Sequence, residues 1–415
     1  IAVYTVESRL LPMPAVRQWL GLAGASVLYA AKDFIMGRYA AESPLFNEFF
    51  YYVFPLTFFV SIISVLSVYC SANYKSTIPT YLNDVVVRFM AIAVVSLYYL
   101  KWFTLDQFIM AFVAIYGIQM IGLIFYIFQF DRPGFKIDWP FFKEQNFVQL
   151  IRYGLLLWFA SVASIGLKFF DAIMIGQYMP LAFVGIYTVA AFIPTIIEAP
   201  LNAFDRIAAS KIAFAWKENN REEINEIYQK SSLYMFMIGG FLFLNVNINI
   251  YDLFTFLPEG YDQGAPIVII LSLASLYNMA TGLNAAILFN SDKYRLGAVF
   301  LISLAVIVLA LQIILIPWLG MIGAATATAL ASFIYNSLLF WYVKKHFNLQ
   351  PFEKENKVLL FLIIVLFGLG FMLPSTGYPL INILYKGIII SGIYIAFVYL
   401  KNLTPEAFDW LKKKK

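Results

Sequence analysis

The sequence predicts an all-α polytopic membrane protein, and three observations support this class. Of 415 residues, 62% are hydrophobic and 13% are charged, with a mean hydropathy of +0.78. A soluble globular protein has roughly half apolar and about a quarter charged residues. The charges gather in short runs between apolar stretches of about 20 residues, the length that a helix needs to cross a bilayer. Lysine and arginine residues, finally, lie almost entirely in every second connection between these apolar stretches.

Twelve apolar segments bounded by charged residues, Pro or Gly are long enough to span a bilayer. The first six are residues 16–36, 49–71, 82–100, 105–128, 152–177 and 182–204. The second six are residues 231–250, 265–289, 296–316, 319–343, 357–373 and 380–400. Each is expected to be a helix, because a single span must satisfy its own backbone hydrogen bonds in lipid.

The lysines and arginines predict how the chain is oriented. On this assignment 24 of the 29 lie on one side of the membrane. The opposite connections hold only Arg38 and Lys101, and residues 249–264 contain acidic side chains but no cation. Cytoplasmic loops retain Lys and Arg. We therefore expect a multi-pass protein of a bacterial or archaeal plasma (inner) membrane, with both visible termini in the cytoplasm.

A shift of about 217 residues superposes the first four spans on the seventh to tenth, which is the mark of a parallel repeat. The repeat predicts two lobes, with residues 1–128 as the N-lobe, 129–151 as a cytoplasmic linker and 152–350 as the C-lobe. Residues 351–415 would form two extra helices and a basic tail. The fifth and sixth spans have no counterpart in the first copy. We therefore expect a full-length protein of about 14 spans whose first two are missing from this chain.

Several functions are disfavoured by what the sequence contains. A single cysteine, Cys70, and a single histidine, His346, offer neither a disulfide framework nor a metal site. We expect no cofactor and no nucleic-acid partner. The predicted outer loops reach only about 15 residues, too short for the folded active site that a membrane enzyme needs. A membrane glycosyltransferase or polymerase is therefore a weaker alternative to a transporter.

Three segments carry a resemblance to a known family. They are residues 170–200 (FDAIMIGQYMPLAFVGIYTVAAFIPTIIEAP), 282–294 (GLNAAILFNSDKY) and 316–331 (IPWLGMIGAATATALA). They resemble the polysaccharide flippases, which carry O-antigen and other lipid-linked oligosaccharides, of the multidrug, oligosaccharidyl-lipid and polysaccharide exporter superfamily. The resemblance covers most of residues 50–400 and implies a two-lobed transporter of 14 helices that works by alternating access. Residues 1–128 would then hold helices three to six of the family.

The resemblance implies a flippase that moves polyprenyl-pyrophosphate-linked oligosaccharide from the cytoplasmic to the outer leaflet, for biosynthesis of lipopolysaccharide or another cell-surface polysaccharide. Its partners would be the lipid-linked oligosaccharide, membrane lipids and a proton or sodium ion for coupling. A multidrug or peptidoglycan-precursor exporter of the same superfamily is the alternative. The drug-extruding branch normally has 12 helices, so the two spans after Gln350 favour the other branches.

Lys168 and Asp171 are the first candidate site residues, because an ionisable group inside a span requires a partner or a water-filled cavity. They stand three residues apart on one helical face and can form an ion pair. Lys168 can instead line a central cavity and meet the substrate pyrophosphate. Both interpretations stay open. Lys386, in the last span, is interpreted as snorkelling to the outer interface or contacting lipid.

Glu198 is the candidate ion-coupling residue, because an unpaired carboxylate there can take up a proton or bind sodium with carbonyls freed by nearby prolines. A salt bridge to Arg206 is the structural alternative. Arg88, Arg152 and Arg206 lie at predicted inner helix ends, where an anionic headgroup would first be met. Topology alone also explains these three arginines.

Two further patterns concern packing. The small residues of 320–331 stand at helical spacing and favour close approach of two helices in lipid, rather than contact with substrate. Residues 211–230 (KIAFAWKENNREEINEIYQK) predict an amphipathic helix lying on the cytoplasmic face.

Overall fold

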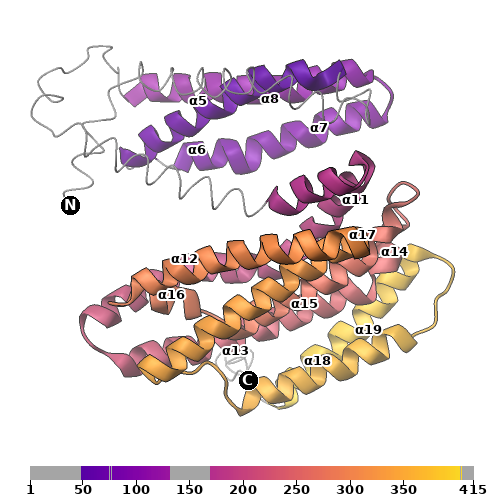
Figure 1. Cartoon of the computed structure of the whole chain (residues 1–415). Coiled ribbons are helices and arrows are strands. Elements are labelled where there is room, and N and C mark those ends of the chain that lie inside the picture. The colour runs from indigo at the N-terminus through magenta and orange to yellow at the C-terminus, as the bar shows by residue number, and fades with distance from the viewer. Residues whose placement is uncertain (1–47, 74, 76, 131–168, 402, 404–415) are drawn as a thin grey trace, which may run out of the picture. The chain divides into compact units, whose positions relative to one another are not determined.

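The computed structural model describes residues 48–73, 75, 77–130, 169–401 and 403. These ranges contain helices and their connections and no strand. The chain divides into two compact units, Ile1–Leu157 and Trp158–Lys415, and each is described by itself (Figure 1). Within the described residues eight helices are long and apolar enough to cross a membrane, or nine if one bent pair counts as a span. The predicted class, an all-α polytopic membrane protein, is confirmed.

The described part of the first unit is a small helical bundle. It comprises η1 (Phe50–Tyr52), α5 (Val53–Ala72), α6 (Thr77–Tyr81), the π-helical turn η2 (Leu82–Val86), α7 (Val87–Tyr99) and α8 (Leu105–Phe130). Both α5 and α7 pack against α8, and Ile115 and Leu123 of α8 are buried. The predicted spans 49–71, 82–100 and 105–128 agree with these helices, whereas span 16–36 lies outside the described residues.

The second unit begins, in its described part, with helical residues 169–178. There follow α11 (Leu181–Phe192), α12 (Thr195–Lys217), α13 (Arg221–Ile248), α14 (Ile250–Phe254), η3 (Tyr261–Gly264), α15 (Ala265–Thr281), α16 (Asn284–Phe289), α17 (Tyr294–Phe347), α18 (Lys354–Met372) and α19 (Pro379–Leu400). The two helices after Gln350, α18 and α19, lie side by side at one edge of this unit (Figure 1).

Two helical stretches of this unit change direction sharply. Helices α11 and α12 meet at an angle of 51°, with Ile193 and Pro194 at the break. The 54-residue α17 contains the predicted spans 296–316 and 319–343, which are separated by a kink at Gly320. Gly320 has φ 58° and ψ −134°, a backbone conformation that is essentially restricted to glycine. The direction of the chain between these spans thus changes at a single glycine.

The amphipathic helix predicted for residues 211–230 is wrong. The chain instead turns sharply between α12 and α13, where Asn219 has φ 54°. Asn220 then begins α13, because its side chain accepts a hydrogen bond from the backbone N–H of Glu223 at 3.2 Å. Asparagine is favourable both in the left-handed conformation and as an N-cap. The apolar side chains of the stretch are therefore divided between two helices.

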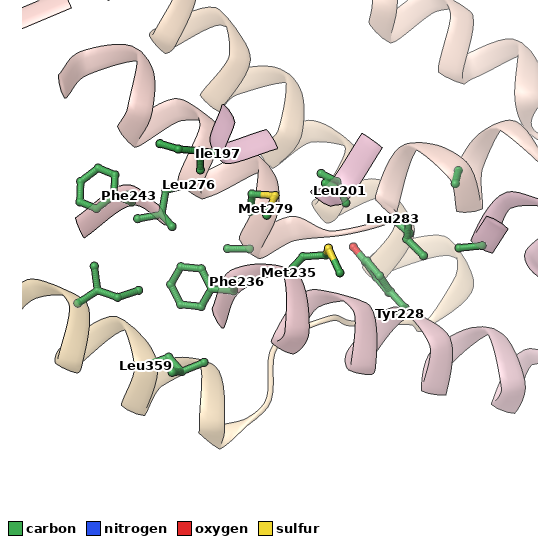
Figure 2. Packing of buried hydrophobic residues seen from close by; sticks show 14 of the residues in the cluster. Ile197, Leu201, Tyr228, Met235, Phe236, Phe243, Leu276, Met279, Leu283 and Leu359 are labelled. Atoms are coloured by element: carbon green, nitrogen blue, oxygen red, sulfur yellow. The ribbon is translucent and has the colours of Figure 1, made fainter. Parts of the chain in front are cut away.

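The main core of this unit lies between α12, α13, α15 and the C-terminal helices. Figure 2 shows Met235 and Phe236 of α13 among side chains of α12, α15 and α18 that point into the same layer. In the second half of α17 the side chains of Ala324, Ala325 and Ala327 are fully buried. The prediction that these small residues serve packing is confirmed, because only short side chains let helix backbones approach closely in lipid.

Polar contacts fix the two C-terminal helices to α13 and α14. On α18, Asn356 donates to Ser232 Oγ at 3.1 Å. On α19, the Tyr394 hydroxyl donates to the Met237 carbonyl at 2.7 Å, and Lys386 Nζ lies 3.0 Å from Asp252 Oδ2. The prediction that Lys386 snorkels or contacts lipid is wrong. It is buried, because an acidic partner comes from α14 and neutralises its charge.

Candidate functional site

Asp171 is the centre of a polar cluster inside the second unit. Its carboxylate accepts hydrogen bonds from the Tyr187 hydroxyl, from Gln312 Nε2 and, at 2.9 Å, from the Thr328 hydroxyl. Tyr187 belongs to α11, whereas Gln312 and Thr328 belong to the two halves of α17. A single carboxylate thus joins helical residues 169–178 to three other helical segments.

The kink at Gly320 is what brings the two α17 residues together. Gln312 and Thr328 stand 16 residues apart, yet Gln312 Nε2 lies 3.5 Å from Thr328 Oγ1. A straight helix would separate them by about 24 Å, since each residue rises 1.5 Å. The glycine therefore does more than connect two spans, because the change of chain direction at Gly320 places one residue from each half of α17 against Asp171.

The cluster is partly buried and holds one acidic group among neutral partners: Asp171 and Thr328 are half-buried, whereas the other two partners are buried. Gln312 is 0% exposed and Tyr187 is 2% exposed, and Met174, Ile175 and Ile186 of the adjoining core surround it. All three partners donate to the carboxylate, which stabilises its ionised form. None of them carries a compensating positive charge. The predicted ion-pair partner, Lys168, lies outside the described residues.

One oxygen of the cluster lacks a partner. Gln312 Oε1 is buried and accepts no hydrogen bond from the described residues. Buried polar atoms are almost always satisfied, so an unsatisfied one calls for an explanation. Oxygens of a carboxylate, an amide and two hydroxyls are suitable ligands for a hard monovalent cation, and the carboxylate is also a proton acceptor. The charge of the Asp171 carboxylate could therefore be neutralised reversibly, by a proton or by a bound monovalent cation.

The other predicted site residues do not join this cluster within the described structure. Arg88 is exposed on α7 and lies 3.8 Å from Asp84, one turn away. Glu198 is half-buried in the first turn of α12 and forms no ion pair among the described residues. Arg152 lies outside the described residues, and so does the side chain of Arg206. Their roles, and the proposed Lys168–pyrophosphate contact, stay predictions.

The sequence analysis did not identify Tyr187, Gln312 or Thr328 as partners of Asp171. A signal existed for Gln312, which is the single polar residue in the apolar run LAVIVLALQIILIPW, residues 304–318. A lone amide at mid-span requires an internal partner, as a charge does. Thr328 gave no such signal, because a threonine in a helix can ordinarily satisfy its hydroxyl with a backbone carbonyl of the same helix and so needs no distant partner.

No family model matches the chain. A curated relative, the uncharacterized membrane protein MJ1068 of Methanocaldococcus jannaschii, is 24% identical over 338 residues, which cover 76% of this chain. The chain spans only 63% of the length of that relative. Among solved structures, lipid II flippase MurJ in an inward closed conformation is similar with a TM-score of 0.72 and 15% identity, covering 96% of this chain and 85% of that one. The chain therefore has the fold of a solved membrane flippase.

Proposed function

We propose that this protein is a flippase for polyprenyl-pyrophosphate-linked oligosaccharides, working by alternating access and supplying cell-surface polysaccharide biosynthesis. The observation that carries the proposal is the fold similarity to a lipid II flippase over 96% of the chain. The three sequence segments that resemble polysaccharide flippases favour an oligosaccharide headgroup. A transporter also suits the short outer loops that the sequence predicts better than an enzyme does.

A peptidoglycan-precursor exporter is the second candidate, because the similar solved structure is named for lipid II. Both candidates move a sugar on a polyprenyl pyrophosphate and differ only in the headgroup. The test is translocation in reconstituted vesicles, with a fluorescent polyprenyl-pyrophosphate oligosaccharide and a peptide-bearing precursor supplied separately and together. We expect the oligosaccharide to move faster and to be competed weakly by the peptide-bearing lipid. The reverse order would assign the protein to the second candidate.

We further propose that Asp171 couples transport to a proton or sodium gradient. A half-buried carboxylate with only neutral donors is costly while it is ionised, and a bound cation would remove that cost. The charge of Asp171 also decides how tightly both halves of α17 and α11 are held, so neutralisation can bias two arrangements of this unit. Glu198 remains a second candidate, because its carboxylate has no described ion-pair partner.

Coupling is tested by varying the two gradients separately across the vesicles. With the wild-type protein, one gradient should accelerate outward movement of the lipid. Asp171→Asn keeps most of the hydrogen-bonding shape and removes the charge, so it should abolish this acceleration while the protein stays folded. Glu198→Gln is the matched variant. If Glu198→Gln alone abolishes the gradient response, the coupling role belongs to Glu198 and the proposal for Asp171 is wrong.

A further inference from the structure

Two hollows of opposite character adjoin at the start of α18. One has a volume of about 410 Å³ and lies between α13, α15 and α18. The other, of about 480 Å³, lies at the end of α18 that the charge pattern places in the cytoplasm. Phe352 and Lys357 line both of them. The two hollows are therefore neighbours that share part of their lining, and we treat them as the apolar part and the polar part of one site.

The apolar part opens sideways onto the hydrophobic surface of the helices. Apart from the two shared residues and Asn356, its lining is apolar or aromatic and comprises Phe236, Leu273, Leu276, Tyr277, Ala280 and Leu360. Leu273 and Leu360 are 52% and 48% exposed, so they stand at the opening, whereas Leu276 and Ala280 form the buried floor. In a bilayer such an opening faces acyl chains rather than water.

The polar part carries charges of both signs. It is lined by Lys354 and Lys357, by Glu353 and Glu355, and by Gln229 and Gln350. The Glu353 carboxylate is already engaged, because it accepts the backbone N–H of Asn356 as the cap of α18. Lys357 and Glu355, in contrast, form no ion pair within the described part of the chain. Lys354 forms no ion pair there either, so two cations and one anion are available to a ligand, and of the two lysines only Lys357 also lines the apolar hollow.

We propose that this site holds one zwitterionic glycerophospholipid of the cytoplasmic leaflet. One acyl chain fills the apolar hollow, and the phosphate meets Lys357 at the junction of the two hollows. The headgroup amine then reaches Glu355 in the polar hollow. In such a lipid the phosphate lies between the acyl chain and the amine, and in the site Lys357 lies between the apolar hollow and Glu355. A lysine near the membrane surface contributes about 1 kcal/mol to binding an anionic lipid group.

The site is separate from the Asp171 cluster, and the proposal does not depend on the proposed function. The bound lipid would be a component of the membrane and not the transported molecule. It would wedge α18 against α13 and α15 and thereby help to hold the C-terminal helix pair in place.

The experiment uses the full chain in vesicles that contain a phosphatidylethanolamine with a photoreactive group in one acyl chain. After illumination, labelled peptides are mapped by mass spectrometry. Labelling is expected on residues 273–280 and 352–360. Lys357→Ala should reduce it about fivefold, and Leu360→Trp should reduce it by filling the opening. Lys344→Ala, which removes an exposed lysine outside both hollows, should leave it unchanged. Circular dichroism confirms that each variant is folded.

Competition separates the possible occupants. Unlabelled phosphatidylethanolamine should displace the probe at lower concentration than phosphatidylglycerol does, and Glu355→Gln should remove this preference. The proposal is overturned if Lys357→Ala and Lys344→Ala label equally, or if the anionic lipid competes better. It is likewise overturned if a polyprenyl-pyrophosphate sugar displaces the probe at equal concentration, because the site would then belong to the transported lipid.

Discussion

Lys386 Nζ lies 3.0 Å from Asp252 Oδ2, and these side chains are only 8% and 15% exposed. Asn382, one turn earlier on α19, donates to the other carboxylate oxygen at 2.8 Å and accepts from the Thr376 backbone and hydroxyl. Both oxygens of the buried acid are therefore satisfied from α19. This network anchors the last helix to α14.

Removing one charge of this pair should be strongly destabilising. Lys386→Met leaves Asp252 buried without a counter-charge and should lower the free energy of unfolding by about 3–5 kcal/mol. The double variant Asp252→Asn with Lys386→Met should recover most of the loss, because no charge remains. Thermal unfolding in detergent, followed by helicity, measures both, and Lys344→Met is the exposed control. A single variant as stable as the wild type would mean that the lysine reaches the interface after all.

Gly240 permits the close packing of α13 on α18. A Cβ atom at this position would lie 2.4 Å from Ile363 Cδ1 and 3.2 Å from the Tyr394 hydroxyl. Ile363 is buried and would have to shift within a packed core, so Gly240→Val should cost about 1–3 kcal/mol. Gly368→Val is the matched control, since a Cβ there meets nothing within 4 Å. Equal melting temperatures of the two variants would show that α18 does not pack tightly on α13.

Gly320 should tolerate no side chain, because its φ of 58° with ψ of −134° is disfavoured for other residues. Gly320→Ala should destabilise the protein by about 1–3 kcal/mol and should also weaken the Asp171 cluster that the kink assembles. Gly392→Ala, in open space within α19, should be neutral or slightly stabilising. Unfolding measurements on the two variants check this, and a Gly320→Ala protein that is as stable as Gly392→Ala would show that the kink does not require glycine.

The predicted orientation can be measured with single cysteines. In a Cys70→Ala background, Lys217→Cys and Lys293→Cys should react with a membrane-impermeant thiol reagent only after the cells are permeabilised. Glu259→Cys, on the connection without cations, should react in intact cells. All three positions are exposed within their unit, so differences in labelling report the side of the membrane. Reaction of Lys217→Cys in intact cells would reverse the predicted topology.

The spans could be predicted from the sequence because they depend on local composition: an apolar stretch of about 20 residues is a helix wherever it lies in lipid. The predictions that were wrong concern features that depend on a single residue or on contacts between distant parts of the chain. The turn at Asn219 and Asn220 is set by backbone conformation within an otherwise helical pattern. Such a turn hardly changes the pattern of apolar and polar residues from which a single helix was predicted for residues 211–230.

The candidate site shows the same limit more clearly. The sequence predicted the neighbouring Lys168 as a partner of Asp171, whereas the described partners of Asp171 are 16, 141 and 157 residues away along the chain. Asp252, in turn, meets Lys386 across 134 residues. A buried ionisable group therefore signals that a partner is needed. Which residue supplies it is decided by how the helices pack, and that is not visible in spacing along the chain.

The most direct test of the proposed flippase is the initial rate at which a fluorescent polyprenyl-pyrophosphate oligosaccharide crosses the membrane of reconstituted vesicles. An impermeant quencher reports the fraction on the far side, and protein-free vesicles give the background. We expect movement well above background with the wild-type protein, and loss of its gradient-driven part with Asp171→Asn. A wild-type rate equal to that of protein-free vesicles, from a folded protein under either gradient, would contradict the account.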